Sequence, residues 1–519
     1  MDETIATSHP IPMDGQTPID AAPSLHGDAL ALGVVLLLVS TVLQRAAGFA
    51  REICFCRWLS PEQLGEWDMA FGFLMLGGPL LVMSLPGTFG RYVDRYRQAG
   101  QLRSFLRRTA GFCLTLTVPS LLAILAFRGW FSYLVFGSRE HQGLIVLLAF
   151  ALPLIIAFNF LTCLATALRN LKVVSLVELA NSVFFGVLGI ALLCCGQSSA
   201  GAMVVAYAGA CLLCVLGSLA WLARMWRNFP QEACCMPHRE LWSRMLPLAA
   251  WIMVINLLWN LFDVVDRYMI VHLLPGSPAE ALAEVGNYRS SRVLPLLLSS
   301  VTIMIAGALL PHLSHDWEAG RRQRVSDRLN LFLKIWAFLL TAGATAVLFL
   351  APELFRVGFQ SKFAGGLSVL PWTLTYCTWF GLSMILQTYL WCAERASLAS
   401  LVALLGVVVN VALNLLWLPQ MGLKGAVLAT AAANVVAMLL MLALSSRYGF
   451  RVHRGTFVGL LLPISIPLGP WVVIMTLATV VTEIVLSDRY LTREEKQEIW
   501  SGLGQYLGKL RIVPGVARP

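Results

Sequence analysis

The stretch that decides the fold is residues 397–445, SLASLVALLGVVVNVALNLLWLPQMGLKGAVLATAAANVVAMLLMLALS, where two apolar runs flank a short polar turn. Each run has about 20 residues, enough for a helix to cross a hydrocarbon core of about 30 Å. Similar runs recur along most of the 519 residues, of which 58% are hydrophobic and 13% are charged. The sequence therefore predicts an all-α integral membrane protein, and no interval between runs is long enough for a soluble domain.

Twelve apolar runs are clear, and each predicts one transmembrane helix. They are 29–50, 66–88, 110–127, 143–167, 174–195, 201–223, 245–272, 287–311, 331–351, 367–392, 397–418 and 425–445. A further apolar segment, 456–486, contains Pro463, Pro467 and Pro470, so it is either one broken span or a tight pair. The fold class is therefore 12 to 14 transmembrane helices.

Lys and Arg are distributed unequally over the loops that connect the first twelve spans. With the N-terminus inside, the inner loops and inner helix ends hold 21 of these residues, and the outer ones hold 7. Because cytoplasmic loops are enriched in Lys and Arg, this bias predicts a multi-pass inner (plasma) membrane protein with a cytoplasmic N-terminus. The same bias explains the net charge of +10 without a nucleic-acid partner.

An internal repeat relates the two halves of the chain. Four landmarks recur at offsets of 222 to 226 residues, each at the same place in the helix order. They are Arg45 with Arg267, Phe136-Gly137-Ser138-Arg139 with Phe359-Gln360-Ser361-Lys362, Gly201-Ala202 with Gly425-Ala426, and Ala167-Leu168-Arg169 with Ala393-Glu394-Arg395. Six spans separate the copies, so both halves run the same way through the membrane as a parallel repeat. We expect two six-helix bundles around a central cleft.

The expected organisation follows from the spans and the repeat. It comprises a disordered cytoplasmic tail (1–27), an N-terminal six-helix bundle (28–228), a cytoplasmic loop (229–243), a C-terminal six-helix bundle (244–448), an extra Pro-rich membrane segment (449–486) and a polar C-terminal tail (487–519).

Ionisable residues inside the spans mark the candidate site, because they are costly in a membrane and usually face a cavity or a partner. Three groups are present, in spans one, seven and eight. They are Arg45 and Glu52 with Gln44 and Arg51 beside them; Asn256, Asn260, Asp263 and Arg267 with Asp266 beside them; and Arg289 with Arg292. Within spans one and seven the spacing of three or four residues places the group on one helical face.

Two interpretations of these groups remain open. They form internal ion pairs, such as Arg267 with Asp263 or Arg45 with an acid of the other half, or they line the cleft; for Arg289 and Arg292 the alternative is snorkelling to the interface. In the cleft interpretation the arginines bind phosphate, since a guanidinium donates two parallel hydrogen bonds. The predicted phosphate ligands are Arg45, Arg51, Arg267, Arg289 and Arg292, and the predicted cleft-lining or ion-coupling residues are Gln44, Glu52, Asn256, Asn260, Asp263 and Asp266.

Motifs of catalysis are missing from the sequence. It contains no GxxxxGK[ST] phosphate-binding loop and no HExxH metal motif, so we expect no cofactor and no metal site. A membrane polymerase or ligase would need a sizeable outer loop, and the longest outer loop expected here has about 15 residues. A transporter is therefore favoured over an enzyme.

Four short motifs occur in order between residues 30 and 450. They are Gln44-Arg45-Ala46-Ala47-Gly48-Phe49-Ala50-Arg51, Leu59-Ser60-Pro61-Glu62-Gln63-Leu64-Gly65, Asp266-Arg267, and Pro419-Gln420-Met421-Gly422-Leu423-Lys424-Gly425-Ala426. In these motifs the chain resembles the polysaccharide flippases of the multidrug/oligosaccharidyl-lipid/polysaccharide superfamily, the Wzx-type O-antigen flippases. The second motif is similar to the family's Leu-Gly-Pro-Glu-x-x-Gly turn, with Ser60 in place of its first Gly.

The resemblance implies a cargo and its direction of transport. The cargo would be an undecaprenyl-pyrophosphate-linked oligosaccharide, moved from the cytoplasmic to the periplasmic leaflet by alternating access for cell-surface polysaccharide such as the O-antigen of lipopolysaccharide. The implied partners are this lipid-linked oligosaccharide, membrane lipid and other polysaccharide-assembly proteins. Two other cargos of the superfamily stay open: lipid II, or a drug carried by a cation-coupled multidrug exporter.

Overall fold

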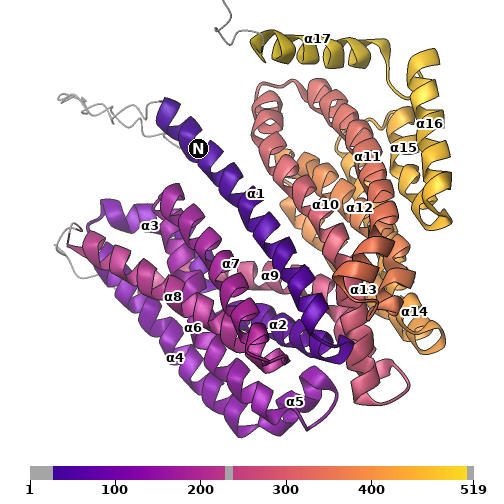
Figure 1. The fold of residues 1–519 in the computed structure, drawn as a ribbon. Coiled ribbons are helices and arrows are strands. Elements are labelled where there is room, and N and C mark those ends of the chain that lie inside the picture. The colour runs from indigo at the N-terminus through magenta and orange to yellow at the C-terminus, as the bar shows by residue number, and fades with distance from the viewer. Residues whose placement is uncertain (1–26, 228, 230–237, 511–519) are drawn as a thin grey trace, which may run out of the picture.

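A computed structural model describes residues 27–227, 229 and 238–510, and this part of the chain contains helices and no strand. The expected disordered tail, apart from Gly27, and most of the expected loop over 229–243 lie outside the described residues. Figure 1 shows two lobes side by side, which are closer together at one end than at the end where α1 begins.

The first lobe contains the first eight helices and one short 3₁₀ turn. These are α1 (Gly27–Trp58), α2 (Pro61–Leu81), η1 (Leu85–Thr88), α3 (Phe89–Gln98), α4 (Leu102–Ala126), α5 (Arg128–Phe136), α6 (Gln142–Ala167), α7 (Leu171–Cys194) and α8 (Ala200–Trp226). Helix α2 and the η1–α3 segment are bent by 60° relative to each other, at a break where Met83 and Ser84 adopt positive φ. The bend lies just after the Gly77-Gly78-Pro79 sequence.

The second lobe is built from the next six helices. These are α9 (His238–Leu273), α10 (Pro278–Glu318), α11 (Arg322–Glu353) with the π-turn η2 (Leu354–Gly358), α12 (Ala364–Cys392), α13 (Ala396–Met421) and α14 (Leu423–Arg447). Each of the twelve expected spans overlaps a long helix of the two lobes, and the second, 66–88, runs across the break from α2 into η1. Among the described residues, ten helices are long and apolar enough to cross a membrane, and the bent pair of α2 with η1–α3 gives up to eleven. The predicted all-α membrane fold is confirmed.

The two lobes meet along α2 and α10, which begin with the same local sequence pattern. Ser60 and Ser277 are the N-caps, each followed by Pro and each forming a capping box, with Gln63 and Glu280 respectively. Further along, the helices touch through glycine: a Cβ on Gly65 would lie 1.8 Å from the carbonyl oxygen of Leu282, and one on Gly286 would lie 1.9 Å from that of Pro61. The two backbones approach this closely only because both positions lack a side chain.

Other contacts between the lobes lie at the same end as this glycine contact. Lys362 donates to the carbonyl oxygen of Arg57 over 2.6 Å, and His272 lies 2.9 Å from the carbonyl oxygen of Leu134. These residues belong to the outer loops and helix ends of the orientation expected from the sequence. The lobes therefore contact each other at the end opposite the start of α1.

Helix α9 packs against both lobes. Leu241, Met245 and Ala249 in its first half are buried in a cluster with α3 and α4, whereas Ile270 and Val271 near its end belong to the main core. The helix starts at His238, so it begins inside the loop that we expected over 229–243. The first half of α9 therefore packs on the first lobe, and its end lies in the core that both lobes share.

The Pro-rich segment forms a tight pair, the second of the two expected alternatives. Its halves are α15 (Arg454–Leu461) continued by η3 (Leu462–Leu468), and α16 (Pro470–Leu486), joined at Gly469, whose φ is +107°. Just before the pair, Asn330 donates to the carbonyl oxygen of Arg451 over 2.8 Å, and just after it Tyr490 donates to that of Lys334 over 2.8 Å. Both contacts lie in the first half of α11, so the pair begins and ends beside the same end of that helix.

The expected polar tail contains one further helix, α17 (Arg493–Leu510), which Figure 1 shows lying across the end of the bundle. Glu495 attaches it to α11: its two carboxylate oxygens lie 2.7 and 2.8 Å from the Lys334 ammonium group, and both side chains are buried. The ion pair joins residues 161 positions apart, and helical periodicity in the sequence does not predict it.

An ion pair at the contact end predicts a pH-dependent stability. His141, which caps α6, contacts Glu66 of α2 over 3.0 Å, and this hydrogen bond raises the pKa of His141. A raised folded-state pKa stabilises the protein fully below the ordinary histidine pKa of about 6.5, and the contribution is lost as pH rises through the raised value. We expect His141→Gln to lower the melting temperature at pH 5.5 and to have a smaller effect at pH 9.

Thermal unfolding of purified protein at the two pH values measures this effect. Glu66→Gln is the matched control, because it removes the other partner and should reproduce the same difference. An equal loss at both pH values would show that His141 acts through packing and not through its charge.

Candidate functional site

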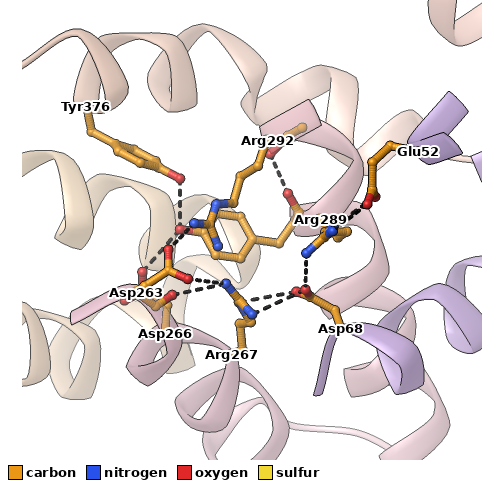
Figure 2. A network of polar contacts seen from close by, with 10 residues as sticks. Glu52, Asp68, Asp263, Asp266, Arg267, Arg289, Arg292 and Tyr376 are labelled. Carbon is orange, nitrogen blue, oxygen red and sulfur yellow. Dashed lines mark hydrogen bonds and ion pairs between the residues drawn. The ribbon is translucent and has the colours of Figure 1, made fainter. Parts of the chain in front are cut away.

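Six charged side chains form a continuous alternation of acids and bases between the lobes, shown in Figure 2. In order of contact they are Glu52, Arg289, Asp68, Arg267, Asp263 and Arg292, and we call them the ion chain. Glu52 and Asp68 come from α1 and α2 of the first lobe, and the other four come from α9 and α10 of the second. The ion chain therefore links the lobes electrostatically beside the glycine contact of α2 and α10.

Arg289 connects the two acids of the first lobe. Its Nε and Nη2 donate to the two carboxylate oxygens of Glu52 over 3.2 and 2.8 Å, which is the bidentate geometry of a strong charge-assisted pair. Its Nη1 donates to Asp68 over 2.7 Å. One guanidinium thus holds α1 and α2 against α10.

Asp68 lies at the centre of the ion chain and is fully buried. Besides Arg289 it contacts Arg267, whose Nη1 lies 3.2 Å from Oδ1 and whose Nε lies 3.2 Å from Oδ2. Arg267 is 3% exposed and also donates to Asp263 over 2.9 Å. The buried guanidinium of Arg267 and the half-buried one of Arg289 therefore share this carboxylate.

The second-lobe end of the ion chain reaches an open space. Arg292 pairs with Asp263, and the Asp263 side chain is 56% exposed although the arginines on either side are buried. Water or a polar ligand can thus approach the ion chain at Asp263. A cavity of about 90 Å³ lies beside this end of the ion chain. Its lining includes Trp259 and Phe262 together with Asp263 and Arg292.

A larger cavity of about 360 Å³ lies on the first-lobe side of the ion chain. It is lined by three arginines and one acid, namely Arg45, Arg51, Arg289 and Glu52, with aromatic rings and leucines around them. Arg51 contacts Glu52 over 3.5 Å and lies 4.3 Å from the ring centre of Phe185. The excess of cations favours an anionic ligand, and the aromatic and aliphatic walls would exclude water from it.

Asp266 occupies a separate cage without a basic residue. Its carboxylate accepts hydrogen bonds from Thr430 over 2.6 Å, Asn414 over 2.9 Å and Tyr288 over 3.1 Å. Tyr288 also contacts Tyr376 over 3.1 Å and lies below the guanidinium of Arg292, 5.4 Å from ring centre to Cζ. The ring of Tyr288 thus connects the Asp266 cage with the ion chain.

The structure brings together most of the residues that the sequence singled out. The ion-pair interpretation is confirmed for Arg267, which pairs with Asp263 on its own helix. Asp263 and Arg292 also border a cavity, and their role in binding a ligand there stays a prediction. Arg289 and Arg292 do not snorkel, since their side chains are 14% and 7% exposed and form ion pairs. Arg45 and Gln44 line the 360 Å³ cavity and take no part in the ion chain.

Two predicted residues lie away from the ion chain. Asn256 donates to Ser84 over 3.3 Å at the bend of α2, and Asn260 donates to the carbonyl oxygen of Asn256 over 2.8 Å. Their contacts satisfy backbone and hydroxyl groups along α9. The polar face of α9 therefore extends beyond the ion chain, and its residues Asn256 and Asn260 serve the packing of the helix.

Sequence reasoning missed Asp68, Tyr288 and Tyr376. Asp68 lies two residues after Glu66 at the start of an apolar span, where acids usually reach the interface. The repeat offers the one usable signal: Gly65 and Gly286 are 221 residues apart, close to the repeat offset, so Asp68 and Arg289 lie three residues after equivalent glycines. The pair is then expected to face each other across the lobe interface.

Comparisons with known proteins agree with this architecture. A family model described as "Polysaccharide biosynthesis protein" matches residues 30–317. None of the curated proteins matches the chain.

Solved structures share the fold at low sequence identity. The lipid II flippase MurJ in an inward closed conformation has a TM-score of 0.63 at 15% identity, covering 91% of this chain and 97% of MurJ. A MATE protein in complex with MaL6 has a TM-score of 0.57 at 14% identity, covering 80% of this chain and 95% of the other. A Vibrio cholerae MATE transporter, VcmN, scores 0.56 at 12% identity, covering 81% and 97%.

The family match covers more than half of the chain, and the fold agrees with it over nearly the whole length. The chain belongs to the polysaccharide biosynthesis protein family, and it shares its fold with the lipid II flippase MurJ and with MATE proteins.

Proposed function

We propose that this protein flips an undecaprenyl-pyrophosphate-linked oligosaccharide from the cytoplasmic to the periplasmic leaflet of the inner membrane. The oligosaccharide would be a precursor of cell-surface polysaccharide such as O-antigen, and the other proteins of its assembly would be partners. One observation carries the proposal: Arg45, Arg51 and Arg289 line the 360 Å³ cavity between the lobes, and Arg292 lines the smaller cavity within the second lobe. Their planar forks suit the oxygens of a pyrophosphate.

The mechanism we propose is exchange of anions on the arginines. In the conformation described, Glu52 and Asp68 neutralise Arg289 and Arg267. A pyrophosphate entering the 360 Å³ cavity would meet Arg45 and Arg51 first and would then compete with Glu52 for Arg289. Once the carboxylates of the first lobe lose their arginines, the electrostatic link between the lobes weakens and the contact end is free to open.

The direction of transport in this proposal follows from the orientation expected from the sequence. With the N-terminus in the cytoplasm, the lobe contacts of Gly65 with Leu282 and of Arg57 with Lys362 lie at the periplasmic end. The conformation described would then receive cargo from the cytoplasmic leaflet. The prenyl chain would stay in lipid while the headgroup moves between the lobes.

Asp266 is our candidate for ion coupling. It is a buried carboxylate surrounded by hydroxyl and amide groups, so either a proton or a small hard cation would complete its cage. The Tyr288 hydroxyl donates to Asp266, and the ring of Tyr288 lies under the Arg292 guanidinium. Occupancy of the cage would therefore influence the ion chain. We expect Asp266→Asn to remove the dependence of transport on the coupling gradient, with Asp327→Asn, an exposed acid on α11, as the matched control.

Vesicles with imposed Na⁺ or proton gradients measure this coupling. The variant should transport at one low rate under all gradients, whereas the wild type and the control should respond to one of them. A variant that responds to the gradient like the wild type would exclude Asp266 as the coupling group.

Two other cargos are tested against the oligosaccharide in cells. We expect deletion of the gene to deplete surface polysaccharide and to accumulate lipid-linked precursor in the inner membrane, and the wild-type gene to reverse both effects. Loss of peptidoglycan synthesis would instead favour lipid II as cargo. Sensitisation to drugs with normal surface polysaccharide would favour a multidrug exporter.

A further inference from the structure

A third cavity lies away from the ion chain, between α11 and the α15–α16 pair. Its volume is about 750 Å³, and its lining includes Arg454 at the start of α15, Val458 and Val480 on the two arms of the pair, and Arg489 just after α16. The pair begins and ends beside this cavity, with a polar segment before α15 and another after α16. The cavity therefore lies at the level where the apolar helices give way to the membrane interface.

The charges of this cavity leave two cations without partners. Arg454 and Arg489 are exposed, and within the described residues neither guanidinium forms a hydrogen bond or ion pair. The nearby Asp488 is already neutralised, because Arg493 and Lys496 bind it over 2.7 and 2.9 Å and their hydrogen bonds lower its pKa. Lys334 is likewise occupied by Glu495.

One acid remains in the lining of this cavity. Glu483 lies on α16, where Ser487 donates to its carboxylate over 2.8 Å. Two free guanidinium groups against one carboxylate leave a net positive charge at the mouth of the cavity. A negatively charged headgroup complements this balance better than a neutral or zwitterionic one.

An apolar groove continues from the cavity along α16. A second hollow of about 320 Å³ shares Thr479 and Glu483 with the cavity and extends over Met475, Ala478 and Leu486. The Met475 and Leu486 side chains are 70% and 79% exposed. A long apolar chain lying in this groove would cover them.

We propose that the cavity holds a resident anionic phospholipid, with its phosphate between Arg454 and Arg489 and an acyl chain along α16. Basic pockets between helices at a membrane interface bind the headgroups of anionic lipids by charge and by hydrogen bonds. The cargo is not the occupant we infer, because this cavity shares no lining residue with the cavities at the ion chain. The lipid would brace the α15–α16 pair against α11, where Tyr490 and Glu495 already attach it.

Native mass spectrometry of the full-length protein in detergent tests the proposal, with phosphatidylglycerol and phosphatidylcholine as the two probes. We expect wild type to retain phosphatidylglycerol about thirtyfold better than phosphatidylcholine, the preference that two arginines at an interface provide. The double variant Arg454→Gln/Arg489→Gln should lose this preference. The matched control is Arg324→Gln/Arg447→Gln, which removes two exposed arginines at the same end of the bundle but outside the cavity.

Three results would overturn the proposal. They are equal retention of the two lipids by wild type, unchanged preference in the double variant, and displacement of phosphatidylglycerol by a lipid-linked oligosaccharide, which would assign the cavity to the cargo. If the double variant does not fold, wild type alone decides: raising the salt concentration should weaken phosphatidylglycerol retention and leave phosphatidylcholine retention unchanged. None of these readouts measures transport, so failure here leaves the proposed flippase function untouched.

Discussion

Asp68→Asn should abolish transport and lower the free energy of unfolding by about 3 kcal/mol, the usual cost of breaking a buried ion pair by removing one partner. The carboxylate is fully buried and compensates both Arg267 and Arg289. An amide of the same size keeps the packing but cannot neutralise two guanidinium groups. The link between the lobes would be left with an uncompensated positive charge.

A second substitution separates stability from function at this position. Adding Arg267→Gln to Asp68→Asn removes the uncompensated charge, so we expect part of the stability to return while transport stays lost. The matched control is Asp94→Asn, because Asp94 is also an aspartate of the first lobe paired with an arginine, Arg169, but both side chains are substantially exposed. Exposed pairs contribute about 0–1 kcal/mol, so the control should behave like wild type.

Thermal unfolding and precursor accumulation in cells measure these two effects. Normal transport by Asp68→Asn, or recovery of transport together with stability in the double variant, would contradict the prediction. In either case the carboxylate would have a structural role alone.

Replacement of the contact glycines should have the second largest effect. A methyl group at Gly65 would lie 1.8 Å from the carbonyl oxygen of Leu282, which belongs to the backbone and cannot rotate away. Helices α2 and α10 must separate by about 1.5 Å to restore van der Waals contact. We therefore expect Gly65→Ala, and likewise Gly286→Ala, to disfavour the closed contact and to reduce transport about tenfold or more.

Gly217→Ala in α8 is the matched control, since no atom lies within 4 Å of the position that its methyl group would take. This control should raise stability slightly, by up to about 1 kcal/mol, because alanine is the better helix former. Double electron–electron resonance spectroscopy, with spin labels attached at positions 140 and 353, measures the separation of the lobes at the contact end. A longer distance in Gly65→Ala and an unchanged one in Gly217→Ala is the expected pair of results; equal distances in both would argue against the closed-contact role.

The membrane fold was predictable because hydrophobic length is a local property. Each of the twelve expected spans depends on residues near each other in the chain. The π-turn after Glu353 and the bend at Ser84 do not disturb that signal. What the apolar pattern cannot provide is the choice between a broken span and a tight pair, which is decided by contacts of Arg451 and Tyr490 with α11.

The site was predictable in part. A polar stripe identifies residues that avoid lipid, and it correctly joined Arg267 with Asp263 one turn apart. The second acid that Arg267 contacts, Asp68, lies 199 residues away, and only the packing of α2 on α9 brings the two together. Arg45 shows the opposite case: it occupies the repeat position of Arg267, but the described structure places it on a cavity wall without an ion pair.

The central claim is that the arginines between the lobes carry a pyrophosphate-linked oligosaccharide across the membrane. Proteoliposomes containing the purified protein and a labelled undecaprenyl-pyrophosphate-linked oligosaccharide test it directly, by the fraction of label that a membrane-impermeant glycosidase reaches over time. We predict that wild type and Asp94→Asn bring the inner-leaflet label within reach of the enzyme, and that Arg289→Gln does not. Label that stays protected with wild-type protein, or that is equally accessible with Arg289→Gln, would contradict the claim.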